Sequence, residues 1–230
     1  MTSAIILAGG SSRRMGEGVD KLMIRAAGLP LLAHALLAFE HCPDVDEIVL
    51  VSREDRKAIC QELAREHRIA KLACVTTGGV ERQDSVWCGL QAMAKNSDIV
   101  LIHDGARSLV TPDIISRCVA AARKDGAAIP ASRVKDTIKR AAPDLRIEAT
   151  VDRSQLWAAQ TPQTFRTDLI RRAYEPLVRE RVIVTDDAAA VERLGHPVTL
   201  VECDPLNLKI TTPEDLLLAE IVLSKRNGKC

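Results

Sequence analysis

Glycine, hydroxyl and basic residues near the start of the chain are spaced so that they could hold a polyphosphate. Residues 4–7 form a short aliphatic run typical of a central strand, and Gly9 and Gly10 end it. Glycine has no Cβ, so the backbone can turn sharply there and bring its N–H groups close to an anion. The alternative is an ordinary turn between a strand and a helix, because glycine-rich loops often occur without a ligand. The side chains that could add donors and positive charge are Ser11, Ser12, Arg13, Arg14 and Lys21.

Two familiar phosphate-binding patterns do not match this stretch. Neither G-x-G-x-x-G nor G-x-x-x-x-G-K-[ST] occurs in it. The stretch instead resembles the loop of nucleotidyltransferases that activate small phosphorylated molecules with a nucleoside triphosphate. That loop reads roughly G-x-x-x-R-M-G followed by a lysine, and its counterparts here are Gly10, Arg14, Met15, Gly16 and Lys21.

The composition excludes several function classes. The chain of 230 residues is long enough for one domain with a sizeable core, and its net charge of +1 gives no general attraction to nucleic acid or to an anionic membrane. Aromatic residues are too few for the stacking platform of a single-strand binder. Seven irregularly spaced cysteines without a C-x-x-C pair favour free thiols in a reducing cytoplasm. No apolar run approaches the ~18 residues of a membrane span, and no signal peptide is expected.

Strand-like and helix-like segments alternate along most of the chain. This alternation predicts crossover units and therefore an α/β fold: a Rossmann-like, doubly wound, mainly parallel sheet flanked by helices. Ligands of such sheets bind beyond the carboxyl ends of the strands, which is where both early glycine pairs lie. The apolar runs that favour strands are 47–52, 71–77, 98–103, 127–130 and 198–202, and the helical patterns are 30–39, 53–67, 167–179, 185–194 and those opening at 111 and 212.

Three further stretches carry polar residues at the ends of predicted elements. Residues 78–90 read GGVERQDSVWCGL, a glycine pair before a helix that we expect Asp84 or Ser85 to cap. In HDGAR, the carboxylate of Asp104 and the guanidinium of Arg107 can bind a polar ligand or a metal phosphate, or can pair with each other. In TDDA, Thr185 precedes two acids and is expected to cap the next helix.

Residues 132–153 are polar and charged, and they interrupt the alternation. The sequences VKDTIKR and TVDR alternate like two strands joined by a turn at 142–145. Such a hairpin has too little apolar surface to be stable alone. We therefore expect a protruding β-arm at 132–153, within a single nucleotidyltransferase domain over 1–230, that packs against a second copy of the chain and so makes a homodimer.

Eight motifs, taken in order, resemble the 2-C-methyl-D-erythritol 4-phosphate cytidylyltransferase family. The resemblance runs from residue 4 to about residue 220. It implies transfer of a cytidylyl group from CTP to methylerythritol phosphate, with Mg²⁺, by a homodimer with interlocking β-arms. HDGARS departs from the family's HDAARP, Leu22 stands where glutamine is common, and AGGSS is closer to molybdenum-cofactor guanylyltransferases. The motifs are the first loop with Lys21, GGVERQDSV, HDGAR, KDTIKR, TVDRSQLW, QTPQTF, TDDA and NLKITTPEDLLLAE.

The resemblance also implies roles for individual residues. Arg14 and Lys21 would act on the CTP phosphates and the pentacoordinate transition state. Mg²⁺ would bridge triphosphate oxygens without a required protein ligand, with Asp104 as the one candidate. Residues implied for the nucleotide are Ala8, Gly9, Gly10, Ser11, Gly79, Asp84 and Ser85. Residues implied for the acceptor are Arg153, Lys209, Thr137, Thr185, Asp104 and Arg107, and Thr137 and Arg153 would reach the partner's site because they flank the hairpin.

The implied reaction explains why no protein nucleophile is needed. A phosphate monoester has its second pKa near ~6, so at pH 7 it is already a nucleophilic dianion. Catalysis is then positioning and charge stabilisation, and His103 is expected to be structural rather than a base. Three alternatives stay open: a ribitol- or pentitol-phosphate cytidylyltransferase, a guanylyltransferase, and a catalytically silent nucleotide-binding relative.

Overall fold

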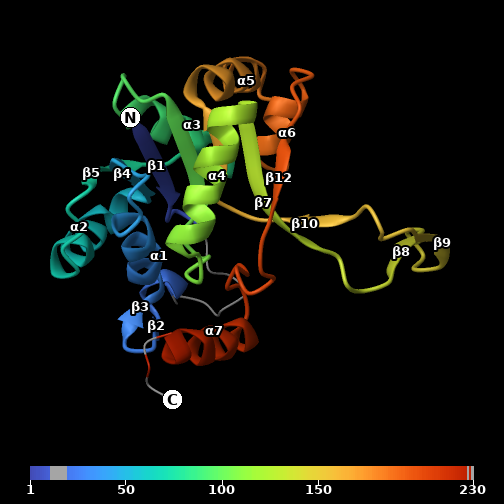
Figure 1. Ribbon diagram of the computed structural model, residues 1–230, viewed down its shortest axis with the longest axis horizontal. Helices are drawn as coiled ribbons and strands as arrows, with labels where there is room; N and C mark the ends of the chain where they lie inside the picture. Colours follow the sequence, from blue (N-terminus) through green and yellow to red (C-terminus); the bar gives the residue numbers. More distant parts are fainter. Residues whose placement is uncertain (11–19, 227, 229–230) are drawn as a thin grey trace.

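A mixed, mainly parallel sheet forms the centre of the molecule (Figure 1). The computed structural model describes residues 1–10, 20–226 and 228. Within these residues the main sheet has eight strands, in the order β10-β7-β11-β6-β1-β4-β5 with β12 beside β7. The strands are β1 (Thr2–Leu7), β4 (Glu47–Ser52), β5 (Leu72–Thr77), β6 (Ile99–Asp104), β7 (Ala127–Arg133), β10 (Trp157–Ala159), β11 (Gln163–Arg166) and β12 (Thr199–Glu202).

The strand directions confirm the predicted fold class. Strand β1 pairs in parallel with β4 on one side and with β6 on the other, and β4 continues in parallel to β5. Strand β12 is parallel to β7, whereas β11 runs antiparallel to both β6 and β7, and β10 runs antiparallel to β7. Because the chain winds in opposite directions from β1, the carboxyl ends of β1 and β6 border the crevice in which doubly wound sheets bind ligands.

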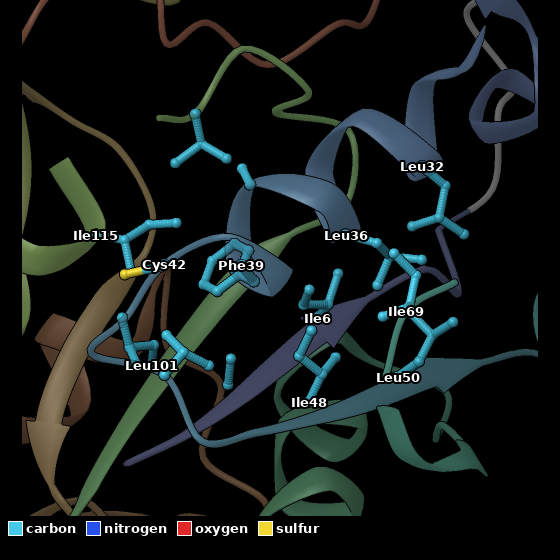
Figure 2. Packing of buried hydrophobic residues seen from close by; sticks show 14 of the residues in the cluster. Ile6, Leu32, Leu36, Phe39, Cys42, Ile48, Leu50, Ile69, Leu101 and Ile115 are labelled. Atoms are coloured by element: carbon cyan, nitrogen blue, oxygen red, sulfur yellow. The ribbon is translucent and has the colours of Figure 1, made fainter. Parts of the chain in front are cut away.

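Helices cover both faces of the sheet, and each face has its own apolar core. Helices α1 (Leu31–Glu40), α2 (Lys57–Glu66) and α4 (Pro112–Asp125) share one core, and α3 (Arg82–Ala92), α5 (Thr167–Glu180) and α6 (Asp187–Glu192) share the other. Strand side chains alternate between faces, so Ile6 belongs to the first core and Ile5 to the second. Figure 2 shows Ile6 beside Leu36 and Phe39 of α1.

A small third core lies under the last helix, α7 (Pro213–Arg226). This helix packs near the short strands β2 (Arg25–Ala26) and β3 (Leu29–Pro30), which follow the 3-10 helix η2 (Lys21–Met23). A second 3-10 helix, η3 (Glu54–Arg56), precedes α2. The segment after Lys21 and the segment before α7 therefore meet in space, although they come from opposite ends of the chain.

The hairpin β8 (Ile138–Ala141) and β9 (Ile147–Val151) forms a separate antiparallel pair that protrudes from the body (Figure 1). At its base, the guanidinium carbon of Arg133 lies 4.4 Å from the centre of the Trp157 ring. At its tip, Leu145 and Ile147 are 87% and 65% exposed. The protruding β-arm predicted from the polar, alternating sequence is therefore present.

Two predicted helix caps are wrong. Helix α3 is capped by Glu81 rather than by Asp84 or Ser85, because Glu81 and Asp84 form a reciprocal capping box in which each side chain accepts from the other's backbone N–H. Helix α6 is capped by Asp186 rather than Thr185, because the Asp186 carboxylate accepts from the N–H of Ala189 at 2.9 Å. In both helices the cap that forms is an acidic residue other than the predicted ones.

The six cysteines in the described part of the chain are free thiols. Across the same residues, no helix is both long and apolar enough to span a membrane.

Candidate active site

A cavity of about 370 Å³ opens beyond the carboxyl ends of β1 and β6. Sheet register places the ends of these two strands side by side, with Leu7 opposite Asp104. The cavity therefore lies where a doubly wound sheet is expected to bind its ligand. Of the residues singled out from the sequence, those that line it are Gly9, Gly10, Lys21, Gly79, Ser85, Asp104 and Lys209.

Asp104 is the most strongly paired carboxylate of the cavity. It is 8% exposed. One of its oxygens accepts from Nζ of Lys209 at 2.8 Å, and the other accepts from Nε of Arg82 at 3.1 Å. Burial alone would raise the pKa of Asp104, but Arg82 and Lys209 outweigh it and hold that pKa well below its usual range. Asp104 is therefore an ionised anchor between two cations.

Arg82 also binds a second, fully buried carboxylate. Its Nη1 and Nη2 donate to the two oxygens of Asp187 at 3.0 and 2.8 Å, and the hydroxyl of Tyr174 donates to the same carboxylate. Burial would lower the pKa of Arg82, but Asp187 and Asp104 raise it instead. Sequence analysis did not single out Arg82, Asp187 or Tyr174. The first two lie inside the quoted motifs GGVERQDSV and TDDA, and their charges were the only signal available.

Lys21, the first residue of η2, lines the same cavity. Helix η2 starts at this residue because Asp20 caps it, its carboxylate accepting from the N–H of Leu22 at 3.1 Å. Nζ of Lys21 donates to the backbone oxygen of Ile210 at 3.2 Å, next to Lys209 in the chain. Two basic side chains that are remote in sequence thus come together, as a polyphosphate site requires.

The glycine pair before α3 brings the backbone close to that helix. A Cβ on Gly79 would lie 2.3 Å from the Cβ of Asp84, and one on Gly78 would lie 2.5 Å from Oγ of Ser85. Only glycine permits this approach without a backbone shift. The carboxylate of Asp84 is part of the capping box of α3, where it accepts from the N–H of Glu81 at 3.0 Å. It does not line the cavity, whereas Val80, 95% exposed, stands at the rim.

His103 is structural. It is fully buried, and burial lowers its pKa to about 3, so its ring is neutral at pH 7. Nε2 lies 3.2 Å from the backbone oxygen of Arg107, which can only accept, so Nε2 carries the proton. Nδ1 then accepts from the hydroxyl of Thr161 at 2.9 Å, and that oxygen accepts from the N–H of Asp104 at 3.1 Å. The ring thereby supports the backbone of Asp104.

Arg107 turns away from the cavity. Its Nη1 donates to the backbone oxygen of Asn207 at 2.8 Å, and the amide of Asn207 donates to the oxygen of Thr161 at 2.9 Å. Arg107 therefore fixes the segment that carries Lys209 instead of lining the cavity or pairing with Asp104.

The remaining sequence candidates are not brought to this cavity by the described part of the chain. The N–H of Ala8 donates to the oxygen of Val51 at 2.7 Å, which ties the residue into the sheet. Thr185 is exposed before α6, while Thr137 and Arg153 are exposed in the arm, where Arg153 donates to the backbone oxygen of Lys135. Ser11 and Arg14, with Ser12, Arg13, Met15 and Gly16, lie outside the described residues.

The described residues contain no group of three or more His, Cys, Asp or Glu side chains placed to hold a metal ion. Both oxygens of Asp104 already accept from cationic side chains. A hard cation at this cavity would therefore take most of its oxygen ligands from a bound polyphosphate and water.

The doubly wound sheet carries two glycine turns and two lysines beside one cavity at its switch point, which is the arrangement expected of a nucleotidyltransferase. A family model described as IspD, 2-C-methyl-D-erythritol 4-phosphate cytidylyltransferase, matches residues 2–225. The chain belongs to this family, which confirms the resemblance drawn from its motifs.

Relatives and solved structures agree with that assignment. The chain is 48% identical to the 2-C-methyl-D-erythritol 4-phosphate cytidylyltransferase of Geobacillus kaustophilus, over 97% of each chain, and 47% identical to that of Dehalococcoides mccartyi, over 96% of each. It superposes on the 4-diphosphocytidyl-2C-methyl-D-erythritol synthase of Anaerococcus prevotii with a TM-score of 0.86 at 31% identity, covering 97% of this chain and 98% of that one. The corresponding enzyme of Thermus thermophilus gives 0.79 at 31% identity, covering 95% and 97%.

Proposed function

We propose that this chain transfers a cytidylyl group from CTP to 2-C-methyl-D-erythritol 4-phosphate and releases pyrophosphate. One observation carries most of the proposal: Lys21 and Lys209, remote in sequence, line one cavity with the ionised carboxylate of Asp104. The membership of the family supports the choice of substrates.

The chemistry asks the protein mainly to bring two anions together. The acceptor phosphate attacks the α-phosphorus of CTP, a bond forms from its oxygen to that phosphorus, and the bond to the pyrophosphate oxygen breaks. In this proposal Lys21, with Arg14, holds the triphosphate and offsets the charge of the transition state. Lys209 binds the acceptor phosphate, and cationic donors of this kind supply roughly two to three orders of magnitude in rate each.

The nucleotide would lie along the two glycine turns. Gly79 and Ser85 would face the cytosine and ribose, and Gly9 and Gly10, which Ser11 follows in the chain, would face the phosphates. Asp84 supports this arrangement through the capping box that it forms with Glu81 at the start of α3. Arg107 does so by holding the segment before Lys209.

A divalent cation, which we propose to be Mg²⁺, would enter as part of the nucleotide complex. Mg²⁺ keeps several waters and commonly binds through substrate phosphates with one or two carboxylates, which fits a cavity with a single candidate ligand, Asp104. When bound, the ion would offset negative charge on the triphosphate.

Assembly through the arm belongs to the same proposal. The exposed apolar tip at Leu145 and Ile147 is suited to burial against a second chain. Arg153 and Thr137 at the arm would then complete the acceptor site of the partner, and Thr185 before α6 would help to orient the acceptor phosphate. The free thiols of the described cysteines support a reducing, cytoplasmic location.

Mixing variants tests the shared site. Lys21→Ala and Arg153→Ala chains are each expected to be inactive, and refolding them together should restore part of the activity through hybrid dimers with one intact site. Mixed dimers that form without any recovery would mean that both residues serve the same chain's cavity.

Pyrophosphate release tests the reaction itself. We expect release only when CTP, Mg²⁺ and 2-C-methyl-D-erythritol 4-phosphate are all present. Preference for ribitol phosphate or for GTP would move the assignment to another transferase, and tight CTP binding without turnover would indicate a silent relative.

A further inference from the structure

We propose that Arg82, anchored by Asp187 and Tyr174, is a positioning residue that fixes the carboxylate of Asp104 and, through it, the ammonium of Lys209 in the cavity. This inference rests on the proposed function, because it explains how the acceptor-binding lysine is aimed. It adds residues from α3, α5 and α6 to those implied by the family resemblance.

The anchor is a planar contact with two hydrogen bonds between Arg82 and Asp187. The guanidinium of Arg82 binds both oxygens of Asp187 through Nη1 and Nη2, which leaves Nε directed at Asp104. A two-bond pair of this kind fixes orientation as well as distance. Asp187 cannot turn aside, because it is fully buried and also accepts from Tyr174.

The contacts that run from Asp187 through Arg82 and Asp104 end on the flexible side chain of Lys209. A lysine ammonium is a compact charge on a four-carbon stem and has no preferred direction of its own. Nζ of Lys209 lies 2.8 Å from the oxygen of Asp104 that Arg82 leaves free. The position of that oxygen therefore sets where the ammonium enters the cavity, which both Arg82 and Lys209 line.

A purely structural role is a poor explanation for this arrangement. Burying a carboxylate and a guanidinium carries a desolvation penalty that their attraction often only matches, so well-packed apolar residues would stabilise the fold equally well. Here the pair instead connects the second core, where Tyr174 lies, to the wall of the cavity. Such a connection suits the orientation of a charge more than general stability.

The test is a double-mutant cycle between Asp187→Asn and Lys209→Met, read as kcat and as KM for each substrate. Asp187→Asn removes the charge that restrains Arg82, so Arg82 can turn fully to Asp104 and displace Lys209. We expect kcat to fall about 10- to 100-fold, the range for misplaced reacting groups, with KM for CTP nearly unchanged. In the Lys209→Met background the same substitution should have little further effect, because the group it acts through is gone.

Two milder variants keep the test valid if Asp187→Asn fails to fold. Tyr174→Phe keeps the charge of Asp187 and removes one hydrogen bond, and Arg82→Lys keeps the charge of Arg82 but loses the planar fork. Each should lower kcat in the wild type and much less in Lys209→Met. The matched control is Arg65→Lys, at an exposed arginine that pairs with Glu62 on α2, for which kcat should not change.

Additive effects in the cycle would overturn the inference, and so would a crystal structure of Asp187→Asn in which Asp104 and Lys209 keep their positions. Either result would leave the proposed function intact as long as the wild type releases pyrophosphate from CTP with methylerythritol phosphate. A wild type without that activity would overturn both.

Discussion

Nζ of Lys209 lies 2.8 Å from the buried carboxylate of Asp104, and Nε of Arg82 lies 3.1 Å from the other oxygen of the same group. One carboxylate thus separates two cations at the wall of a cavity that needs positive charge for its proposed ligands. Removing this carboxylate would leave Arg82 paired with Asp187 alone and would take the Asp104 partner from Lys209, whose side chain is 40% exposed. Losing two charge-assisted hydrogen bonds destabilises the fold, although water can partly solvate the ammonium of Lys209.

Asp104→Asn should therefore lower the free energy of unfolding at pH 7 by about 1–3 kcal/mol, measured by urea denaturation. The double variant Asp104→Asn with Lys209→Met should recover part of this loss, because it also removes one of the two cations. Asp113→Asn is the matched control, since Asp113 makes only an exposed pair with Arg117 and should change stability by about 1 kcal/mol or less. Equal losses in the single and double variants would contradict the ion-pair account.

His103 should make stability depend on pH in a defined direction. Its folded-state pKa of about 3 lies below the ordinary value of ~6.5, so the unfolded chain binds a proton that the folded chain rejects. The contribution is present above pH ~6.5 and is lost as pH falls toward the folded pKa, at up to about 1.4 kcal/mol per pH unit.

The measurement compares urea denaturation of wild type and His103→Gln at pH 7 and pH 5. The variant lacks the titrating ring, so the stability gap between the two proteins should shrink by about 2 kcal/mol over that interval. A gap that stays constant would show that the buried ring does not reject the proton.

Gly79→Ala should loosen the loop before α3. The added Cβ would lie 2.3 Å from the Cβ of Asp84, an atom held by the helix backbone, so the loop has to move away. We expect a loss of about 1–3 kcal/mol in unfolding free energy and a higher KM for CTP. Gly10→Ala is the control for stability, because a Cβ there would meet no atom of the described residues within 4 Å and its effect should stay within about 0.5 kcal/mol. Equal stability losses in the two variants would contradict the steric argument.

The elements of the body could be predicted from the sequence because their signals are local. The apolar run at 47–52 coincides with β4 (Glu47–Ser52), and the threonine, proline and acid at 111–113 open α4 (Pro112–Asp125) as expected. The cap of α3 could not, because Asp84 and Ser85 looked like caps by residue type, whereas the geometry of the loop starts the helix earlier, at Glu81.

The site could be predicted only in part, for a similar reason. The strand end before HDGAR located Asp104 and the family resemblance located Lys209. The partner of Arg82, however, lies on a different helix, and only the packing of α3 against α5, and of α5 against α6, brings Asp187 to it. The orientation of the Arg107 side chain could not be predicted either. Its partner is the backbone oxygen of Asn207, and a backbone oxygen is present at every residue whatever its type.

Lys21→Met is expected to reveal whether this lysine acts on the transition state. In the proposed reaction its ammonium offsets charge that appears at the α-phosphate as the bond to pyrophosphate breaks, so its loss should lower kcat by about 10²- to 10³-fold with a smaller change in KM for CTP. Steady-state kinetics measure this, with thermal unfolding to show that the variant is folded and Lys225→Met, an exposed lysine on α7, as the matched control. A raised KM with unchanged kcat would mean that Lys21 binds substrate and transition state equally well. The catalytic charge would then have to come from elsewhere, and the proposed role of Lys21 would be wrong.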